Sequence, residues 1–587
     1  MRMLLALTLV TTFAVNAQTT IPAGYWPVEK SREILAKTET IRLAPDLSKL
    51  TEGERGAVNE LIQVGYLFQK LYEDSRHHQA TRAYWELQEL DRKLGSPERT
   101  RNLIELYRLN QGPIAQTLDN ARVPFLPVDP QVPARNVYPI DATKEELEAY
   151  LAKHPEQRDS ILGERTVVRR ATKANLDRDL GVLASESIHS LFHPTLAHDL
   201  KTMARKPDPK AFYAVPYSVA YAKELTDAFR RLTHAAQLVE KDDAEFARYL
   251  RNRARDLITN DYEAGDASWV TGRFSKLNAQ IGAYETYDDA MFGVKAFHAV
   301  SILLRNEKAT EELSAQLGNM QAFEDALPYE SDKRIREDIP VGVYDVIADF
   351  GQARGTNTAT ILPNDALFSR RYGRTILLRE NIMKHPDIFA ADQRVWRNVT
   401  IPAHANDIAP EGNFRRTLWH EIGHYLGVDR DKQGRTLDVA LQDYADASEE
   451  MKADLVSLFA LHRMNLPPAT LRAIQASGIR RTLQNVKPRT DQAYNTMQLV
   501  QFNWFLDKGL LTSDADGRLT VHYDRYPEVV QSLLAEVLRL QHEGNRDTTA
   551  AFFGKWTTWG DPHEKVAARI REAQGARWRI VRYAAID

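Results

Sequence analysis

The residues best suited to chemistry are His420, Glu421 and His424, which form a His-Glu-x-x-His motif. On a helix, side chains four residues apart project from one face, about one turn from each other. Both imidazoles can therefore reach a single Zn²⁺, and Glu421 lies where it can hold the metal-bound water. Zinc lowers the pKa of that water toward neutrality, and Glu421 is the base that takes its proton as the water attacks a carbonyl. The alternative is two unrelated histidines on an ordinary helix.

A second helical pattern, residues 448–459, offers a third ligand. Glu450 and Asp454 stand four residues apart and share a helix face. We predict that Glu450 binds the zinc and that Asp454 accepts the other ring N–H of a ligand histidine. Glu449 points roughly 100° away, and we interpret it as a solvated partner of Lys452 or as a charge favourable near a helix N-terminus. The alternative is that all three acids are surface charges.

The elements that position these residues follow from apolar periodicity. Leu418, Ile422 and Leu426 recur every four residues, so the motif helix should pack on a core. Gly427 stands where the residue just beyond a helix end is expected. Further helices are predicted over 31–118, 180–188, 218–238, 244–259, 492–509 and 529–540. Strands are predicted over 166–170, 341–347, 375–379, 395–401 and 519–523.

Composition and length bound the architecture. The chain has 587 residues, of which 43% are hydrophobic and 27% charged, which is typical of a globular protein too long for one core. We therefore expect a mainly α-helical α+β fold with two lobes flanking a cleft and the zinc site on helices of the C-terminal lobe. The lobes are predicted as residues 18–345 and a catalytic 346–587, and they can interleave. A net charge of −3, without a basic cluster interleaved with aromatics, argues against nucleic-acid binding.

The first residues predict a cleaved signal peptide over residues 1–17. Arg2 supplies the positive charge, residues 4–15 the apolar run, and Val15-Asn16-Ala17 a small-x-Ala cleavage site before Gln18. The alternative is a buried N-terminal helix. The run is too short to span a membrane and no later stretch of about 20 apolar residues exists, so we expect no membrane insertion. The absence of Cys suits a periplasmic or secreted protein without disulfides.

Several segments, in order, resemble the dipeptidyl-peptidase III family of zinc metallopeptidases and its bacterial relatives. Residues 449–454, Glu-Glu-Met-Lys-Ala-Asp, resemble its Glu-Glu-x-Arg-Ala-(Glu/Asp) motif, and residues 281–287 resemble its Ile-Gly-x-x-Glu-(Ser/Thr)-Tyr segment, which contains Glu285 here. Residues 361–365 resemble its Asn-Ile-Pro-Asn substrate loop, and residues 492–509 the helix that carries its transition-state histidine. The resemblance implies that Glu450 is a zinc ligand, that the substrate is a peptide, and that Glu285 and Asn364 lie near it.

The chain departs from this family at three kinds of position. Two residues separate the motif histidines where the family typically has three. Gln280 stands at the position of the catalytic tyrosine and Tyr494 at that of the histidine, while Asn278 falls near the glutamate that anchors a substrate's amine. Gln280 is therefore assigned to substrate binding. Tyr494 is either a hydrogen-bond donor to the oxyanion or a core aromatic of its helix.

We therefore predict an exported zinc metallopeptidase with one Zn²⁺ per chain, held by His420, His424 and Glu450. It would hydrolyse peptide bonds through a zinc-bound water, with Glu421 as general base. Two alternatives stay open. One is a zinc hydrolase of a non-peptide amide or other small substrate. The other is a catalytically impaired peptide-binding protein on the same scaffold, which the departures at Gln280 and Tyr494 motivate.

Overall fold

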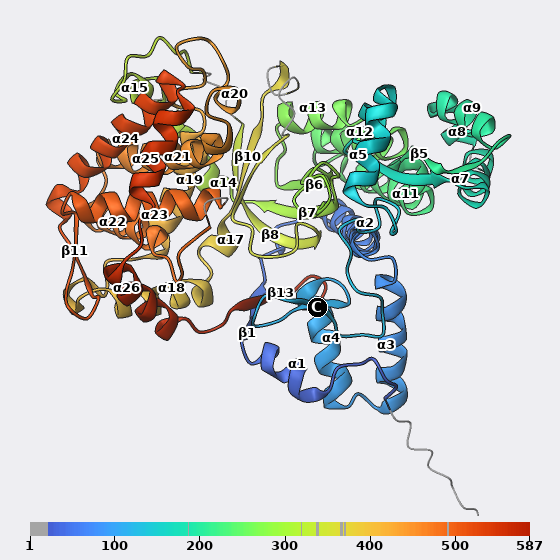
Figure 1. Cartoon of the computed structure of the whole chain (residues 1–587), viewed down its shortest axis with the longest axis horizontal. Coiled ribbons are helices and arrows are strands. Elements are labelled where there is room, and N and C mark those ends of the chain that lie inside the picture. Colours follow the sequence, from blue (N-terminus) through green and yellow to red (C-terminus); the bar gives the residue numbers. More distant parts are fainter. Residues whose placement is uncertain are drawn as a thin grey trace, which may run out of the picture.

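The computed structural model describes residues 21–185, 187–317, 320–335, 340–363, 368, 371–489 and 492–587. The predicted signal peptide and Asn364 lie outside the described residues. The chain has the mainly helical α+β fold that its sequence predicts (Figure 1). Among the described residues, no helix is both long and apolar enough to cross a membrane.

A five-stranded sheet lies between two helical regions (Figure 1). Its strand order is β6-β7-β8-β10-β9. The bounds are β6 (Leu277–Ala283), β7 (His298–Arg305), β8 (Val341–Gly351), β9 (Ala359–Leu362) and β10 (Thr375–Arg379). All neighbouring strands are antiparallel except β8 and β10, which are parallel. Both sheet faces are buried: Ile376 and Leu378 of β10 join one apolar core, whereas Leu377 between them joins another.

Helices from the first half of the chain cover one face of this sheet. Helix α2 (Glu52–Arg76) begins at a capping box, in which the Thr51 side chain accepts from the Glu54 N–H and the Glu54 side chain accepts from the Thr51 N–H. It packs on β7, β8 and α11. The other helices of this half are α1 (Val28–Leu35), α3 (Ala80–Leu94), α4 (Glu98–Asn110), α5 (Lys144–Lys153), α6 (Arg158–Ile161), α7 (Lys173–Ser185), α8 (Ser187–Phe192), α9 (Pro194–Met203), α10 (Tyr217–Ala220), α11 (Ala222–Val239), α12 (Ala244–Thr259) and α13 (Glu263–Thr271).

The second half of the chain forms a separate helical bundle with its own apolar core. Several of its helices begin with proline in the first turn, where the missing N–H costs nothing. The bounds are α14 (Glu307–Leu317), α15 (Met320–Asp325), α17 (Glu380–Met383), α18 (Pro386–Val399), α19 (Pro410–Gly423), α20 (Leu437–Leu441), α21 (Ala445–Arg463), α22 (Pro468–Thr482), α23 (Ala493–Asp507), α24 (Tyr526–Glu543), α25 (Arg546–Trp556) and α26 (Asp561–Ala573).

Short strand pairs complete the fold. The C-terminal strand β13 (Trp578–Tyr583) returns to the first half of the chain and pairs in parallel with β1 (Thr38–Leu43). The remaining pairs are β2 (Ile114–Gln116) with β3 (Arg122–Pro124), β4 (Thr166–Ala171) with β5 (Asp208–Pro216), and β11 (Leu511–Ser513) with β12 (Leu519–Val521). Residue 345, the predicted lobe boundary, lies inside β8, and the division into two lobes stays a prediction.

The strand predicted over 395–401 is wrong. Residues up to Val399 belong to α18, which begins at Pro386 and buries Val395, Trp396 and Val399 on one face. The local sequence Val-Trp-Arg-Asn-Val is compatible with either element, and the spacing of its buried residues follows the helical period once the upstream turns are included.

Candidate metal centre

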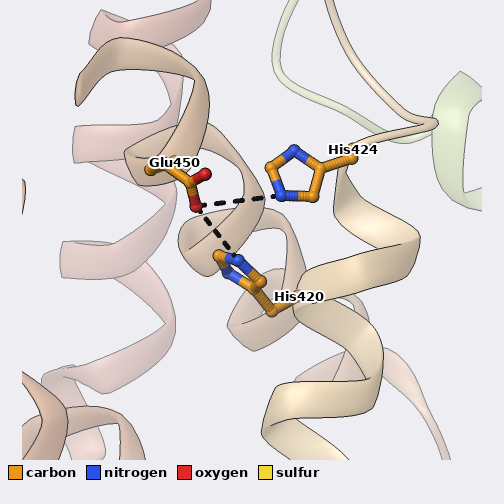
Figure 2. A group of neighbouring side chains, drawn as sticks. All are labelled: His420, His424 and Glu450. Atoms are coloured by element: carbon orange, nitrogen blue, oxygen red, sulfur yellow. Dashed lines mark ion pairs between the residues drawn. The ribbon is translucent and has the colours of Figure 1, made fainter. Parts of the chain in front are cut away.

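Helix α19 carries the two motif histidines and ends at them. Its last residue is Gly423, and His424 is the C-cap residue with φ −67° and ψ −20°. The helix thus ends sooner than the position of Gly427 predicts, although Gly427 does adopt a positive φ of 82°. Because His424 keeps helical dihedral angles, its ring remains on the same face as that of His420 (Figure 2).

A close contact between α19 and α21 brings the third residue of the group into place. A Cβ atom on Gly423 would lie 2.6 Å from the carbonyl oxygen of Ala453, a distance that real Cβ atoms do not show. Only glycine at this position lets the two backbones approach so closely. One turn farther on, the Ser457 hydroxyl donates to the Arg416 carbonyl at 2.9 Å and holds the helices together. Glu450 therefore faces the two rings.

His420, His424 and Glu450 form a group that can hold a metal ion. Their ligand atoms all lie within 4.8 Å of one another. Glu450 Oε2 is 3.2 Å from His420 Nε2 and 3.8 Å from His424 Nε2 (Figure 2). Tetrahedral N and O ligands of zinc at about 2.0–2.1 Å would be separated by about 3.3 Å. Glu450 Oε2 is also buried without a hydrogen-bond partner among the described residues. Because buried polar atoms are normally satisfied, this oxygen is suited to bind a cation.

Asp454 orients the first histidine. Its Oδ1 accepts from His420 Nδ1 at 2.8 Å, which leaves Nε2 directed at Glu450. Asp454 is 3% exposed. It also accepts hydrogen bonds from Arg481 Nε at 2.9 Å and from Arg416 Nη1 at 3.3 Å. Burial by itself would raise the pKa of Asp454, but these cationic neighbours hold that pKa well below its usual range. Burial likewise opposes protonation of His420, yet the charge of Asp454 and the contact with Glu450 raise the pKa of His420 to about 9.

Glu449 orients the second histidine, a role that the sequence interpretation missed. Its Oε1 accepts from His424 Nδ1 at 2.9 Å. The predicted pairing with Lys452 is also present, at 2.8 Å, but Glu449 is only partly exposed, and Lys452 is buried. Burial would raise the pKa of Glu449, but the charges of Lys452 and His424 outweigh it and lower the pKa to about 2. Each of two ligand histidines needs an acceptor for its Nδ1–H. The second acid beside Glu450 in the sequence was therefore a signal that Glu449 could be one of these acceptors.

A cavity of about 720 Å³ opens beside the group, between the helical bundle and the sheet. Glu421, His424, Glu449 and Glu450 line its bundle side. Its other lining residues are Gln280, Tyr284, Glu285, Tyr287, Ala299, Gln352, Ala353, Asn357, Ala359, Thr360, Ile361, Arg374, Arg379 and Tyr494. The structure therefore brings the predicted Gln280, Glu285 and Tyr494 to the same cavity as Glu421.

Tyr494 lies in the first turn of α23 and is 52% exposed, so it is not a core aromatic. Its hydroxyl interacts with the Glu450 carboxylate. Desolvation in the cavity and the negative charges of Glu450 and Glu421 raise the pKa of Tyr494. The hydroxyl therefore stays protonated at neutral pH and can donate a hydrogen bond beside the metal group.

The other predicted substrate residues occupy the sheet side of the cavity. Gln280, on β6, is 7% exposed, and its Oε1 receives Arg379 Nη2 at 3.4 Å. Glu285 follows the end of β6, and burial raises its pKa. The sequence interpretation overlooked Arg379, although a charged residue at the end of the apolar segment 375–379 was a usable signal.

Sequence comparisons with known proteins find a relative that matches part of its own length. No protein-family model matches the chain. Nudix hydrolase 3 from Arabidopsis thaliana is 28% identical over an alignment of 444 residues, and the match covers 73% of this chain and 55% of that protein. The chain thus spans about half the length of the curated relative that it matches.

Two solved structures are similar over nearly the whole chain. The dipeptidyl-peptidase III from Caldithrix abyssi superimposes with a TM-score of 0.79 at 24% identity, over 94% of this chain and 99% of that one. The dipeptidyl-peptidase III from Corallococcus sp. strain EGB gives 0.73 at 25% identity, over 95% and 98%. The family resemblance predicted from the sequence is confirmed by this shared fold.

Proposed function

We propose that this chain, which has the dipeptidyl-peptidase III fold, is a zinc-dependent metallopeptidase. The observation that carries the proposal is the state of Glu450 Oε2. It is buried without a hydrogen-bond partner among the described residues and faces two imidazole nitrogens at 3.2 and 3.8 Å. Both rings have their Nδ1 atoms engaged by carboxylates, so their Nε2 atoms remain available as ligands.

The donor set fits zinc. His420, His424 and Glu450 would be the three protein ligands, and two imidazoles with one carboxylate make a usual catalytic set. When bound, the zinc ion acts as a Lewis acid that polarises a carbonyl and lowers the pKa of water. Asp454 and Glu449 hold the two rings in the orientation that such a site requires.

The remaining cavity residues divide the chemistry. Glu421 would accept the proton of the attacking water and return it to the leaving amine, because its carboxylate lines the cavity beside the metal group. Tyr494 would donate a hydrogen bond from its hydroxyl to the oxygen of the scissile carbonyl as negative charge develops there. Its raised pKa keeps that proton in place.

The test is zinc analysis of the purified mature protein together with mass spectrometry of a mixed peptide library, beside Glu421→Gln. We expect one bound zinc in both proteins and cleavage by the wild type alone. One bound zinc with intact peptides would contradict the peptidase and leave the non-peptide hydrolase or the binding protein. No bound zinc with His420 and His424 in place would contradict the metal site itself.

We also propose that the protein is exported after cleavage before Gln18. The support is the pattern of Arg2, the apolar run 4–15 and Val15-Asn16-Ala17. Mass spectrometry of protein recovered from the periplasm or medium should show a mature N-terminus at Gln18. Recovery of the chain in the cytoplasm with residues 1–17 intact would contradict export.

A further inference from the structure

A buried arginine lies at the sheet side of the cavity and forms no ion pair with any residue that the structure describes. Arg379 ends β10 and is 1% exposed. Its Nη1 donates to Thr360 Oγ1 at 2.7 Å, and its Nη2 to Gln280 Oε1 at 3.4 Å and Ser301 Oγ at 3.3 Å. Its Nε has no hydrogen-bond partner, and no carboxylate among the described residues forms an ion pair with it. The guanidinium charge is therefore met by neutral groups, two of them at long distance.

A buried guanidinium without a carboxylate partner lowers the stability of the fold, so a function is the natural reason for its presence. A guanidinium does not lose its proton, so burial cannot neutralise it. Buried charges are normally paired, and an uncompensated one is strongly destabilising. Elsewhere in this chain a wholly buried arginine does have acidic partners: Arg253 forms ion pairs with Asp256 and Asp266. Arg379 forms no such ion pair with any described residue.

The strand register explains why no carboxylate reaches Arg379. Gln280, Ser301 and Asp349 stand opposite one another across β6, β7 and β8. Ser301 contacts Arg379 and so lies between the guanidinium and Asp349. Burial raises the pKa of Asp349 to about 6 although the charge of Arg379 opposes the rise. Asp349 thus compensates the arginine only through space.

The guanidinium faces the cavity that serves the metal group. Thr360 and Gln280, which receive its two Nη atoms, line that cavity, as do Arg379 and Arg374. On the bundle side, the cavity is lined by the acids Glu421, Glu449 and Glu450. A cavity of about 720 Å³ is within the usual range for bound small molecules, roughly 300–1,000 Å³. One molecule can therefore reach from the metal group toward Arg379.

We propose that Arg379 binds a carboxylate of the substrate and fixes the peptide in the cavity. This proposal rests on the proposed peptidase function and names its substrate class as peptides that carry an anionic group at that point. Arginine matches a carboxylate through two parallel N–H···O bonds. Nη1 has one acceptor and keeps a second N–H, and Nη2 makes only long contacts, at 3.4 and 3.3 Å, which a carboxylate can replace. The carboxylate is either the C-terminus of a short peptide or an acidic side chain, and both are recognised by the same chemistry.

The test measures binding to zinc-loaded Glu421→Gln, which retains the pocket without turnover. The probes are four short peptides of one sequence: the free acid, its C-terminal amide, and the Glu→Gln counterpart of each. We expect removal of the recognised carboxylate to weaken the Kd at least tenfold. Sensitivity to amidation identifies the C-terminus, and sensitivity to Glu→Gln identifies the side chain. A change below twofold in all comparisons would overturn the proposal.

Two second-site variants in the same background assign the effect to Arg379. Arg379→Met should remove the discrimination between acid and amide, or between Glu and Gln, while binding of the neutral peptide stays within about threefold. If that variant fails to fold, Gln280→Glu takes its place, because it leaves Arg379 present and gives it an internal carboxylate. Discrimination that survives in Gln280→Glu would contradict the role of Arg379.

The same design separates this proposal from the proposed function. Cleavage by the wild type without carboxylate discrimination would sustain the peptidase and remove the Arg379 site. Carboxylate-dependent binding without cleavage of any peptide would sustain the Arg379 site on a protein that binds peptides, and would remove the peptidase.

Discussion

The two sides of the cavity differ in whether their buried charged groups have oppositely charged partners. On the bundle side, each imidazole is paired with a carboxylate, and Asp454 also receives two guanidinium groups. On the sheet side, Arg379 is equally buried, but among the described residues its hydrogen bonds go to a threonine, a serine and an amide. The difference teaches that the metal group is arranged to bind a cation, whereas Arg379 is placed to bind an anion. Under the proposed function, a zinc ion would balance the metal group, and a carboxylate of the peptide substrate would balance Arg379.

Glu421→Gln is expected to have the largest effect, because it removes the base on the bundle side without disturbing the charge pairs. Turnover should fall roughly 10²- to 10⁴-fold, with zinc stoichiometry and melting temperature unchanged. Kinetics and metal analysis of the same preparation provide the measurement. Wild-type turnover in this variant would show that the bundle side acts without its carboxylate base.

Asp454→Asn tests the pairing around His420 and should cost both metal and stability. We expect the zinc affinity to fall about 10- to 100-fold and the free energy of unfolding by about 3–5 kcal/mol, because Arg416 and Arg481 lose their buried carboxylate. Zinc competition and thermal unfolding measure the two effects.

Glu449→Gln is the matched variant on the second histidine. It should weaken zinc binding by about tenfold with a smaller loss of stability, because the Glu449 side chain is more exposed than that of Asp454 and its partner Lys452 also donates to the Leu426 carbonyl at 2.7 Å. Equal losses of stability in the two variants would contradict this account of the two carboxylates.

Zinc binding should release a proton from His420 near neutral pH. Its pKa of about 9 in the metal-free protein means that the ring is protonated at pH 7 and 8, and that zinc must displace this proton. The apparent zinc affinity should then rise with pH and level off above about 9. The favourable charge pair in the metal-free protein is fully present below pH 6.5 and is lost as the pH rises through about 9.

Calorimetry in two buffers with different ionisation enthalpies counts the released protons. Asp454→Asn provides the control, since removal of that charge lowers the pKa of His420 and should reduce proton release at pH 8. Proton release that is the same in both proteins would place the proton elsewhere.

The smallest effect is expected on the sheet side. Gln280→Glu supplies Arg379 with a carboxylate and should raise stability by about 1–2 kcal/mol, an increase in melting temperature measured by thermal unfolding. Gln352→Glu is the matched control, since the same change there faces Asp288, which now accepts from Gln352 Nε2 at 2.8 Å. That variant should be destabilised by like-charge repulsion. Destabilisation in both variants would mean that Arg379 is already compensated.

Sequence periodicity alone was enough to predict the two residue pairs from which the metal group is built. His420 with His424 and Glu450 with Asp454 are each four residues apart, and a helix places such pairs on one face whatever surrounds it. The α+β class, the helix at 244–259 and the strand at 375–379 likewise follow from local patterns and match α12 and β10. These features depend on neighbours in the chain, which the sequence displays directly.

Only the tertiary structure decided the roles of Glu449 and Arg379. Glu449 meets His424 across 25 residues because α19 ends at that histidine and approaches α21 at Gly423. Arg379 meets Gln280 across 99 residues because the strand register and the order β8-β10 bring them together. Electrostatic partners at such separations are set by packing and register, not by periodicity, so the sequence determined the ligand-bearing helices and the fold determined what balances their charges.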